Sequence, residues 1–449
     1  MEQRLTAANG IPIYAYPSPH LHSFCISLYI KAGALYESEE ESGITHFWEH
    51  MEFRNINHSY SGGLYRLLDS LGASMNAATY KEFMQIRITA APQHFETCAQ
   101  ILSKVFLPFE LRGPQALGRE VFDAERRRVK SEIREAEERT SLDYLAQTLV
   151  WKGTPLEKTI LGRHKALDRV GAASLQRAKE RFLTPDGAFF YVTGCYTAEH
   201  LEYLARICTL PVGRRKGAAG QDGPLSAGGV WEARRNLAPV PADFFHRDCQ
   251  VAIKNADFTL VRFSFDFATD RYSMAELNLL YDALFRGESC GFFQALSDES
   301  GMVYSYDARM EKYRNIGSLY FSYEVQANRL MESLEKTLEV LTWAREGRMD
   351  LNCLLPFYTD NAGMLLDDPE ELNWSLAYEH HIMETPFTTL EESAEGYRKV
   401  TARRLGEVAG EIFRPSNLIL AVKCSKKRFS SEPMRALLQK GLEESASPG

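Results

Sequence analysis

The stretch THFWEH, residues 45–50, brings together two histidines and an acid that could share one chemical task. In a helix, His46 and His50 lie one turn apart on the same face, and Glu49 shares that face. Two neutral imidazoles and one carboxylate suit a zinc ion and leave a position for water. A nearby carboxylate that is not a ligand can take a proton from that water. The alternative is a surface helix on which these residues are simply neighbours.

The order of these residues indicates which class of zinc-binding motif they could form. Glutamate precedes the second histidine, which gives H-x-x-E-H, the order of the inverzincins; in the common zincins it follows the first histidine. A third ligand is needed, and residues 121–139 are the best candidate region because they read as a long, charged helix. Glu125 and Glu132 lie two turns apart on one face of it. Spacing alone does not choose between them and the other acids of this segment.

The composition argues against several classes of protein. A chain of 449 residues favours two domains of about 200 residues each. The net charge of −8 argues against nucleic acid and against an anionic membrane surface as partners. The eight cysteines are scattered without a CxxC pair, and no signal segment is visible at the N-terminus, so we expect a cytoplasmic protein with reduced thiols. No run of apolar residues is long enough to predict a transmembrane span.

Two similar halves are visible along the chain. Residues 62–90 predict a helix, a glycine turn and then strands, and residues 290–325 predict the same order, as an internal duplication would. A segment rich in Gly, Pro and Ala separates the halves. We predict a zinc-bearing domain at 1–212, a linker at 213–245 and a second, repeat-like domain at 246–449.

The alternation of apolar and polar residues indicates the fold class. Met84, Ile86 and Ile88 alternate with polar residues, so one face of this strand is expected to be buried. Helices follow strands in blocks and not in strict alternation. We therefore predict an α+β fold, in which each half is an antiparallel-rich β-sheet covered by helices on one face.

Four segments together resemble one family. HFWEHMEF, GASMNAATYKE, ERRRVKSEI and TPLEKTILG are similar, in this order, to segments of the pitrilysin or insulin-degrading-enzyme family of inverzincin zinc metallopeptidases. The length and the duplication resemble its half-size branch, which includes bacterial members and the mitochondrial processing peptidase subunits. The resemblance implies Zn2+ held by His46, His50 and Glu132, with Glu49 as the general base of peptide hydrolysis. It also implies that Glu125 orients a ligand histidine.

The resemblance also implies how a peptide substrate binds. The family pattern G-x-x-x-N-A-x-T ends here on Asn76, Ala77 and Thr79, and in relatives it forms an exposed edge strand that pairs with the peptide. Main-chain pairing accepts many sequences, and small side chains let a second backbone approach. The alternative is an ordinary hairpin. Phe53 occupies the family's aromatic position near the cleaved bond, with core packing as the alternative.

The second half departs from the family pattern. Relatives resemble L-R-x-x-x-G-[LM]-x-Y, whose arginine and tyrosine bind the substrate, whereas ALSDESGMVYSY has Tyr304 at the tyrosine position but Ser297 at the arginine position. Serine carries no charge and makes no bidentate fork to a carboxylate. We therefore expect a heterodimer whose zinc-less partner supplies the Arg/Tyr pair. The alternative is a homodimer that uses another cation, such as Arg286 or Arg309.

The expected function is that of a zinc-dependent endopeptidase that hydrolyses extended peptides in a closed clamshell chamber. The resemblance suggests peptide maturation by removal of leader segments as one such role. The alternatives are a homodimeric peptide-degrading protease and a non-catalytic structural or regulatory subunit of a processing complex. The intact set of His46, Glu49, His50 and Glu132 argues against the non-catalytic alternative.

Overall fold

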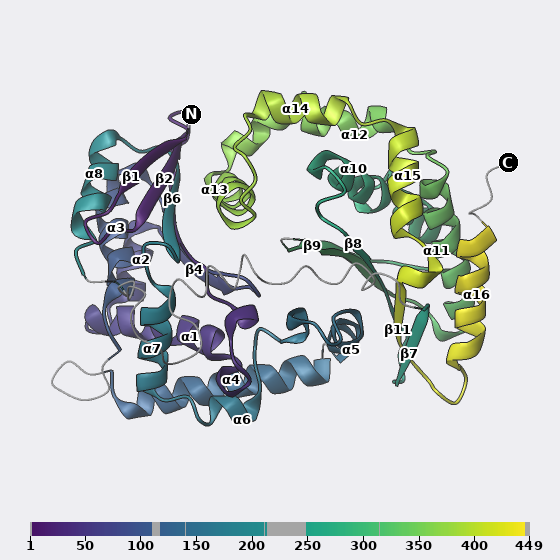
Figure 1. The fold of residues 1–449 in the computed structure, drawn as a ribbon, viewed down its shortest axis with the longest axis horizontal. Helices are drawn as coiled ribbons and strands as arrows, with labels where there is room; N and C mark the ends of the chain where they lie inside the picture. Colours follow the sequence, from purple (N-terminus) through teal and green to yellow (C-terminus); the bar gives the residue numbers. More distant parts are fainter. Residues whose placement is uncertain are drawn as a thin grey trace, which may run out of the picture. The chain divides into compact units, whose positions relative to one another are not determined.

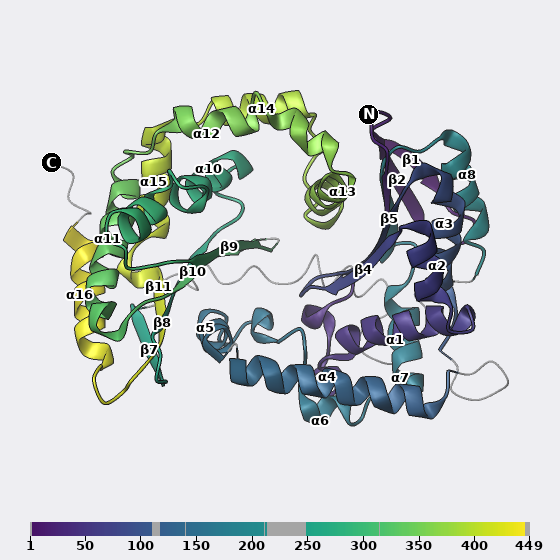
Figure 2. The ribbon, with the colours of Figure 1, turned by 180° about the vertical axis from the view of Figure 1, so that it is seen from behind.

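The computed structural model describes residues 2–109, 117–139, 141–210, 212, 248–313 and 315–444. The chain forms two compact units, and each is built from several segments (Figures 1 and 2). Unit 1 comprises residues 1–136, 158–237 and 364–386, and unit 2 comprises residues 137–157, 238–363 and 387–449. Each half of the chain thus gives one segment to the other unit. The predicted linker at 213–245 lies outside the described residues, so the domain boundaries stay a prediction.

Unit 1 is built on a six-stranded sheet in the order β1-β2-β6-β3-β5-β4. The strands are β1 (Gln3–Thr6), β2 (Pro12–Pro17), β3 (Phe24–Ile30), β4 (Ser74–Thr79), β5 (Met84–Ala90) and β6 (Ala188–Gly194). β2 and β6 are parallel, whereas the other neighbouring strands are antiparallel. β4 lies at one edge of this sheet and pairs with β5.

Helices cover one face of this sheet (Figure 1). They are α1 (Ile44–Ser59), α2 (Leu64–Leu71), α3 (Phe95–Ser103), α7 (Ala172–Phe182) and α8 (Ala198–Ile207). The short α6 (His164–Leu167) and most of α4 (Arg119–Arg139) belong to the same unit. Met84, Ile86 and Ile88 are buried and face the same side as Phe24, whose ring contacts that of Phe95 in α3. The predicted alternation of β5 is therefore confirmed, with its apolar side toward the helices.

The opposite face of the same sheet carries a helix from the second half of the chain. α13 (Pro369–Ala377) packs on β6 and β3, and a buried side chain anchors it. Asn373 accepts a hydrogen bond from the Tyr29 hydroxyl at 3.0 Å and donates to the Tyr191 carbonyl oxygen at 2.9 Å. No periodic pattern links residues so far apart in the chain, so the sequence gives no local sign of this contact.

Unit 2 repeats the plan with five strands in the order β7-β11-β8-β10-β9. The strands are β7 (Gln250–Asn255), β8 (Leu260–Phe267), β9 (Tyr306–Lys312), β10 (Gly317–Glu324) and β11 (Leu418–Cys424). The helices that build its core or lie beside it are α10 (Met274–Phe285), α11 (Leu330–Arg345), α12 (Leu351–Tyr358), α14 (Leu390–Arg398), α15 (Ala402–Ile412) and α16 (Ser431–Glu444). α5 (Ser141–Val150), from the first half, packs on β8 and β11, where Arg262 pairs with Asp143.

The predicted α+β class with two similar halves is confirmed. Each sheet is antiparallel-rich with one parallel pair, β2–β6 in unit 1 and β7–β11 in unit 2. The exchanged helices α13 and α5 add a layer that the prediction did not contain, because their contacts are long-range. Among the described residues, no helix has both the length and the apolar character needed to cross a membrane.

Candidate metal centre

A buried acid fixes the start of the motif helix α1. Gly43, its N-cap, has a φ of 89° and no side chain that could cap the helix. Glu37 takes over this function: its Oε2 accepts from the Gly43 N–H at 2.7 Å and its Oε1 from the Thr45 N–H at 2.9 Å. Gly162 lies so close to Gly43 that a Cβ on Gly162 would be 2.3 Å from the Gly43 Cα. The start of the helix is therefore held from two sides.

A buried ion pair holds the inner side of the same helix. Lys179 of α7 contacts both carboxylate oxygens of Glu52, at 2.8 and 3.1 Å, and both side chains are buried. Trp48 also donates to Glu52, at 2.9 Å, and Lys179 donates to the Leu107 carbonyl at 2.7 Å. Each buried charge therefore has hydrogen-bonded partners. These contacts hold α1 against α7 and against the segment at Leu107.

Both motif histidines point at one carboxylate oxygen. The Glu132 Oε2 lies 3.1 Å from the His46 Nε2 and 3.4 Å from the His50 Nε2. Glu132 belongs to α4, the long charged helix that the sequence predicts, and its side chain is one-third exposed. α1 and α4 therefore bring together the three residues that were predicted as zinc ligands.

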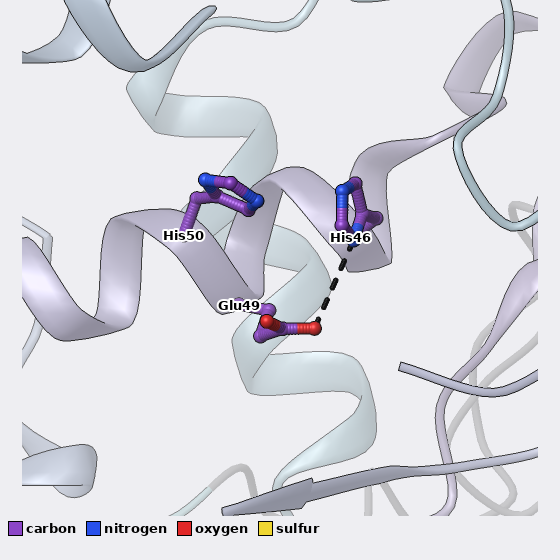
Figure 3. A group of neighbouring side chains, drawn as sticks. All are labelled: His46, Glu49 and His50. Carbon is purple, nitrogen blue, oxygen red and sulfur yellow. Dashed lines mark ion pairs between the residues drawn. The ribbon is translucent and has the colours of Figure 1, made fainter. Parts of the chain in front are cut away.

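Glu49 lies on the same side of α1 as the histidines (Figure 3). Its Oε2 is 3.8 Å from the His46 Nδ1, and it accepts a hydrogen bond of 2.5 Å from the hydroxyl of Thr79 in β4. Polar atoms of His46, Glu49 and His50 all lie within 4.8 Å of one another. The structure thus places Glu49 beside the cluster, in contact with the edge strand.

Glu125 contacts the second histidine of the motif. Its Oε2 lies 3.2 Å from the His50 Nδ1, and its Oε1 accepts from the Arg54 Nε at 2.6 Å. A proton on Nδ1 leaves the Nε2 lone pair of His50 free to face Glu132. The orienting role of Glu125 stays a prediction. Arg54 was not predicted, although its spacing of four residues from His50 places it on the same face of α1.

The charges of the cluster stabilise one another. Burial lowers the pKa of His46, but the hydrogen bond to Glu132 and the attraction of the Glu49 carboxylate outweigh it and raise that pKa to about 9. Burial raises the pKa of Glu49, but the attraction of His46 and the hydrogen bond from Thr79 outweigh it, so the pKa falls below its ordinary value. The hydrogen bond with His46 is the main cause of a lowered pKa at Glu132. Both carboxyl groups are therefore ionised at neutral pH.

The donor set and its spacing fit zinc. Two imidazole nitrogens and one carboxylate oxygen are the ligands of one common type of catalytic zinc site. Ligands about 2.0–2.1 Å from a tetrahedral ion lie about 3.3 Å apart. The distances from Glu132 Oε2 to the two Nε2 atoms, 3.1 and 3.4 Å, bracket that spacing. His46, His50 and Glu132 are the residues that could hold the ion.

The predicted substrate strand is an edge strand. In β4, Asn76 is exposed and Ala77 half-buried, and their partners in β5 are Arg87 and Ile86. Phe53 is half-buried on α1. The geometry of β4 is suitable for pairing with a further strand, whereas the substrate roles of these residues stay predictions.

Tyr304 belongs to unit 2, as does Ser297. Tyr304 is fully exposed in the loop before β9. Ser297 lies in the π-helical turn η7 (Phe293–Asp298). Their predicted part in a site therefore involves the second unit, and it stays a prediction.

Comparison with known proteins points to one family of peptidases. A family model described as Insulinase (Peptidase family M16) matches residues 15–164, a range that contains α1, β4, β5 and α4. This third of the chain is therefore similar to the M16 peptidase family. An uncharacterized zinc protease, YmxG, of Bacillus subtilis (strain 168) is 21% identical to this chain over 420 residues, covering 92% of the chain and 96% of the relative.

Two further M16 comparisons add to this. The beta subunit of the mitochondrial-processing peptidase of Lentinula edodes is 25% identical over 219 residues, covering 48% of this chain and 46% of that one. A peptidase M16 inactive domain from Pseudomonas fluorescens has the same fold, with a TM-score of 0.76 at 11% identity, covering 95% of this chain and 98% of that one. The family is one of zinc proteases, but its fold also occurs in an inactive domain, so the side chains of the site must decide activity.

Proposed function

We propose that this chain is a zinc-dependent endopeptidase that hydrolyses extended peptides. One observation carries the proposal: the Nε2 atoms of His46 and His50 converge on one carboxylate oxygen of Glu132 at the spacing of zinc ligands. Zinc held there supplies the Lewis acidity that polarises a peptide carbonyl and acidifies a water.

The chain's own residues have separate tasks in this proposal. Glu49 accepts the proton of the attacking water and later delivers it to the leaving amine. Its lowered pKa keeps it ionised at neutral pH, so that it can accept a proton. Glu125 holds the proton on the Nδ1 of His50, which keeps the Nε2 available as a ligand.

The edge strand β4 is the proposed docking site for the peptide. An extended peptide that pairs with the free edge of β4 gains main-chain hydrogen bonds through Asn76 and Ala77 without a strict sequence requirement. Because Thr79, at the end of the same strand, touches Glu49, a docked peptide runs beside the proposed base. Phe53 is the proposed apolar contact near the cleaved bond.

The oxyanion of the reaction requires a hydrogen-bond donor besides zinc. We propose that a zinc-less partner chain supplies an arginine and a tyrosine, since this chain has Ser297 where relatives carry the arginine. Tyr304, fully exposed, is the proposed tyrosine in a homodimer, with Arg286 or Arg309 as its cation. The beta-subunit relative comes from a processing peptidase with more than one subunit, which favours the heterodimer. Full activity of the purified chain alone would exclude that assembly.

The direct test uses fluorogenic extended peptides and two matched variants. We expect Glu49→Gln to keep about one zinc per chain and to lower hydrolysis by about 10²–10⁴-fold, because the proton acceptor is lost. Glu135→Gln, an exposed change on α4, should leave both values unchanged. Undiminished turnover in Glu49→Gln would refute the assignment of the base.

The main competing function is that of a non-catalytic subunit in a processing complex. A chain that binds no zinc and cleaves no peptide, even with its partner present, would support it. A cytoplasmic location and the removal of leader segments remain further parts of our proposal. Cell fractionation tests the first, and cleavage of leader-bearing peptides against their mature counterparts tests the second.

A further inference from the structure

The proposed base and the proposed docking strand are joined by one short hydrogen bond. The Thr79 hydroxyl donates to the Glu49 Oε2 at 2.5 Å. The nearest nitrogen of His46 is 3.8 Å from the same oxygen, which is beyond hydrogen-bond distance. Among the described residues, Thr79 therefore provides the nearest hydrogen-bond donor to the carboxylate of Glu49.

The strand register fixes where the hydroxyl points. Thr79 is the last residue of β4 and lies opposite Met84, the first residue of β5. Met84 is buried on the helix-covered face of the sheet, and cross-strand partners point to the same face. The side chain of Thr79 therefore points toward α1 because of its place in the ladder.

Threonine is well suited to hold a carboxylate still. Its β-branched side chain has restricted χ1 rotamers, so the hydroxyl has few alternative positions. Glu49 has a longer side chain with several rotatable bonds, and a free carboxylate would occupy several rotamers. The hydrogen bond to Oε2 limits the rotamers of Glu49. The other oxygen, Oε1, is then available to accept a proton.

We infer that Thr79 is a positioning residue, which fixes the Glu49 carboxylate relative to the strand that receives the peptide. This inference rests on the proposed function. The peptide would pair along β4, and the base is hydrogen-bonded to the end of the same strand. The strand therefore holds the scissile bond and the water-activating carboxylate at a constant distance and orientation to each other. The docking strand thus contributes to the chemical step as well as to binding.

The test compares the isosteric variant Thr79→Val with Thr79→Ser. Valine keeps the shape and the strand preference but removes the hydroxyl, so kcat should fall roughly 10- to 100-fold while KM and zinc content stay unchanged. Serine keeps the hydroxyl and should restore most of kcat. Thr89→Val in β5, opposite Ser74 at the other end of the ladder, is the matched control and should behave as wild type.

Several results would overturn the inference. They are a wild-type kcat in Thr79→Val, a loss in Thr79→Ser as large as that in Thr79→Val, or an equal loss in Thr89→Val. An inactive wild-type chain would instead count against the proposed function, so the two failures are distinguishable. A crystal structure of Thr79→Val gives a readout without turnover: several Glu49 rotamers support the inference, and one unchanged rotamer overturns it.

Discussion

The two sheets of this chain each have an edge strand whose last residue contacts a helix, but the contacting groups differ. In unit 1, Thr79 at the end of β4 donates to Glu49 of α1. In unit 2, the ammonium group of Lys312 at the end of β9 lies 3.1 Å from the Met274 Sδ and 3.4 Å from the Asn278 Oδ1, both on α10. β4 and β9 occupy the same position in their sheets, and each follows its helix in the chain.

Met274 and Asn278 have the same four-residue spacing as His46 and His50. A thioether and an amide oxygen are poor ligands for zinc compared with imidazole. Lys312 contacts both, so unit 2 has an ammonium group beside the pair of side chains, where unit 1 has a carboxylate. The same frame therefore positions an i, i+4 pair in both units, and the residue types of the pair place the candidate metal site in unit 1.

The largest expected effect comes from making α1 resemble α10. The double variant His46→Met/His50→Asn gives α1 the pair that α10 carries, so we expect loss of zinc and a fall in hydrolysis of at least about 10³-fold. Zinc analysis and peptide cleavage measure the two effects. His58→Asn, near the end of the same helix, is the control and should keep both. Full zinc content in the double variant would mean that the metal is bound elsewhere.

A large effect on stability is expected from the support of α1, the buried Glu52–Lys179 pair. Lys179→Met leaves the Glu52 carboxylate buried without its cation, so the free energy of unfolding should fall by about 3–5 kcal/mol. Chemical denaturation measures this value, and Lys165→Met, at an exposed site, should change it little. A loss below about 1 kcal/mol would show that α1 does not depend on this pair.

The pH dependence of zinc binding tests the raised pKa of His46. Zinc needs neutral imidazole, whereas the metal-free His46 is protonated below a pKa of about 9. Zinc affinity should therefore rise about tenfold per pH unit from pH 7 toward 9 through this one proton. The metal-free protein should show the opposite dependence on pH in its stability. The free energy of unfolding that His46 contributes is fully present below pH 6.5 and is lost as the pH rises through about 9. Calorimetry of zinc binding in buffers of different ionisation enthalpy counts the proton that is released. Zinc binding without release of a proton would contradict the raised pKa of His46.

The smallest expected effect lies in unit 2. Lys312→Met removes hydrogen bonds to uncharged partners at a partly exposed site, so we expect a loss of about 0.5–1 kcal/mol in the stability of unit 2, with zinc content unchanged. Lys336→Met, on the exposed side of α11, is the control. Zinc loss in Lys312→Met would mean that unit 2 takes part in the metal site.

Much of unit 1 follows from local sequence patterns. The spacing of His46, Glu49 and His50 predicts one face of a helix, and the seven-residue spacing of Glu125 and Glu132 predicts the matching face of α4. The choice of Glu132 as the residue that both histidines face required the family resemblance and then the structure, because neighbouring acids fit the same spacing.

Other features depend on contacts that no local pattern encodes. Glu37 caps α1 from outside the helix because Gly43 has no side chain, and only the folded chain brings the two together. Asn373 reaches the first sheet from the second half of the chain. The sequence also places Tyr304 in the second half without indicating which chain's zinc it would serve.

Zinc K-edge X-ray absorption of the purified chain tests the central claim most directly. The account predicts about one zinc per chain, bound by nitrogen and oxygen at about 2.0–2.2 Å, with imidazole scattering and no sulfur shell at about 2.3 Å. A zinc–sulfur shell, which would implicate cysteines in place of His46, His50 and Glu132, would contradict the account, and so would a chain that binds no zinc.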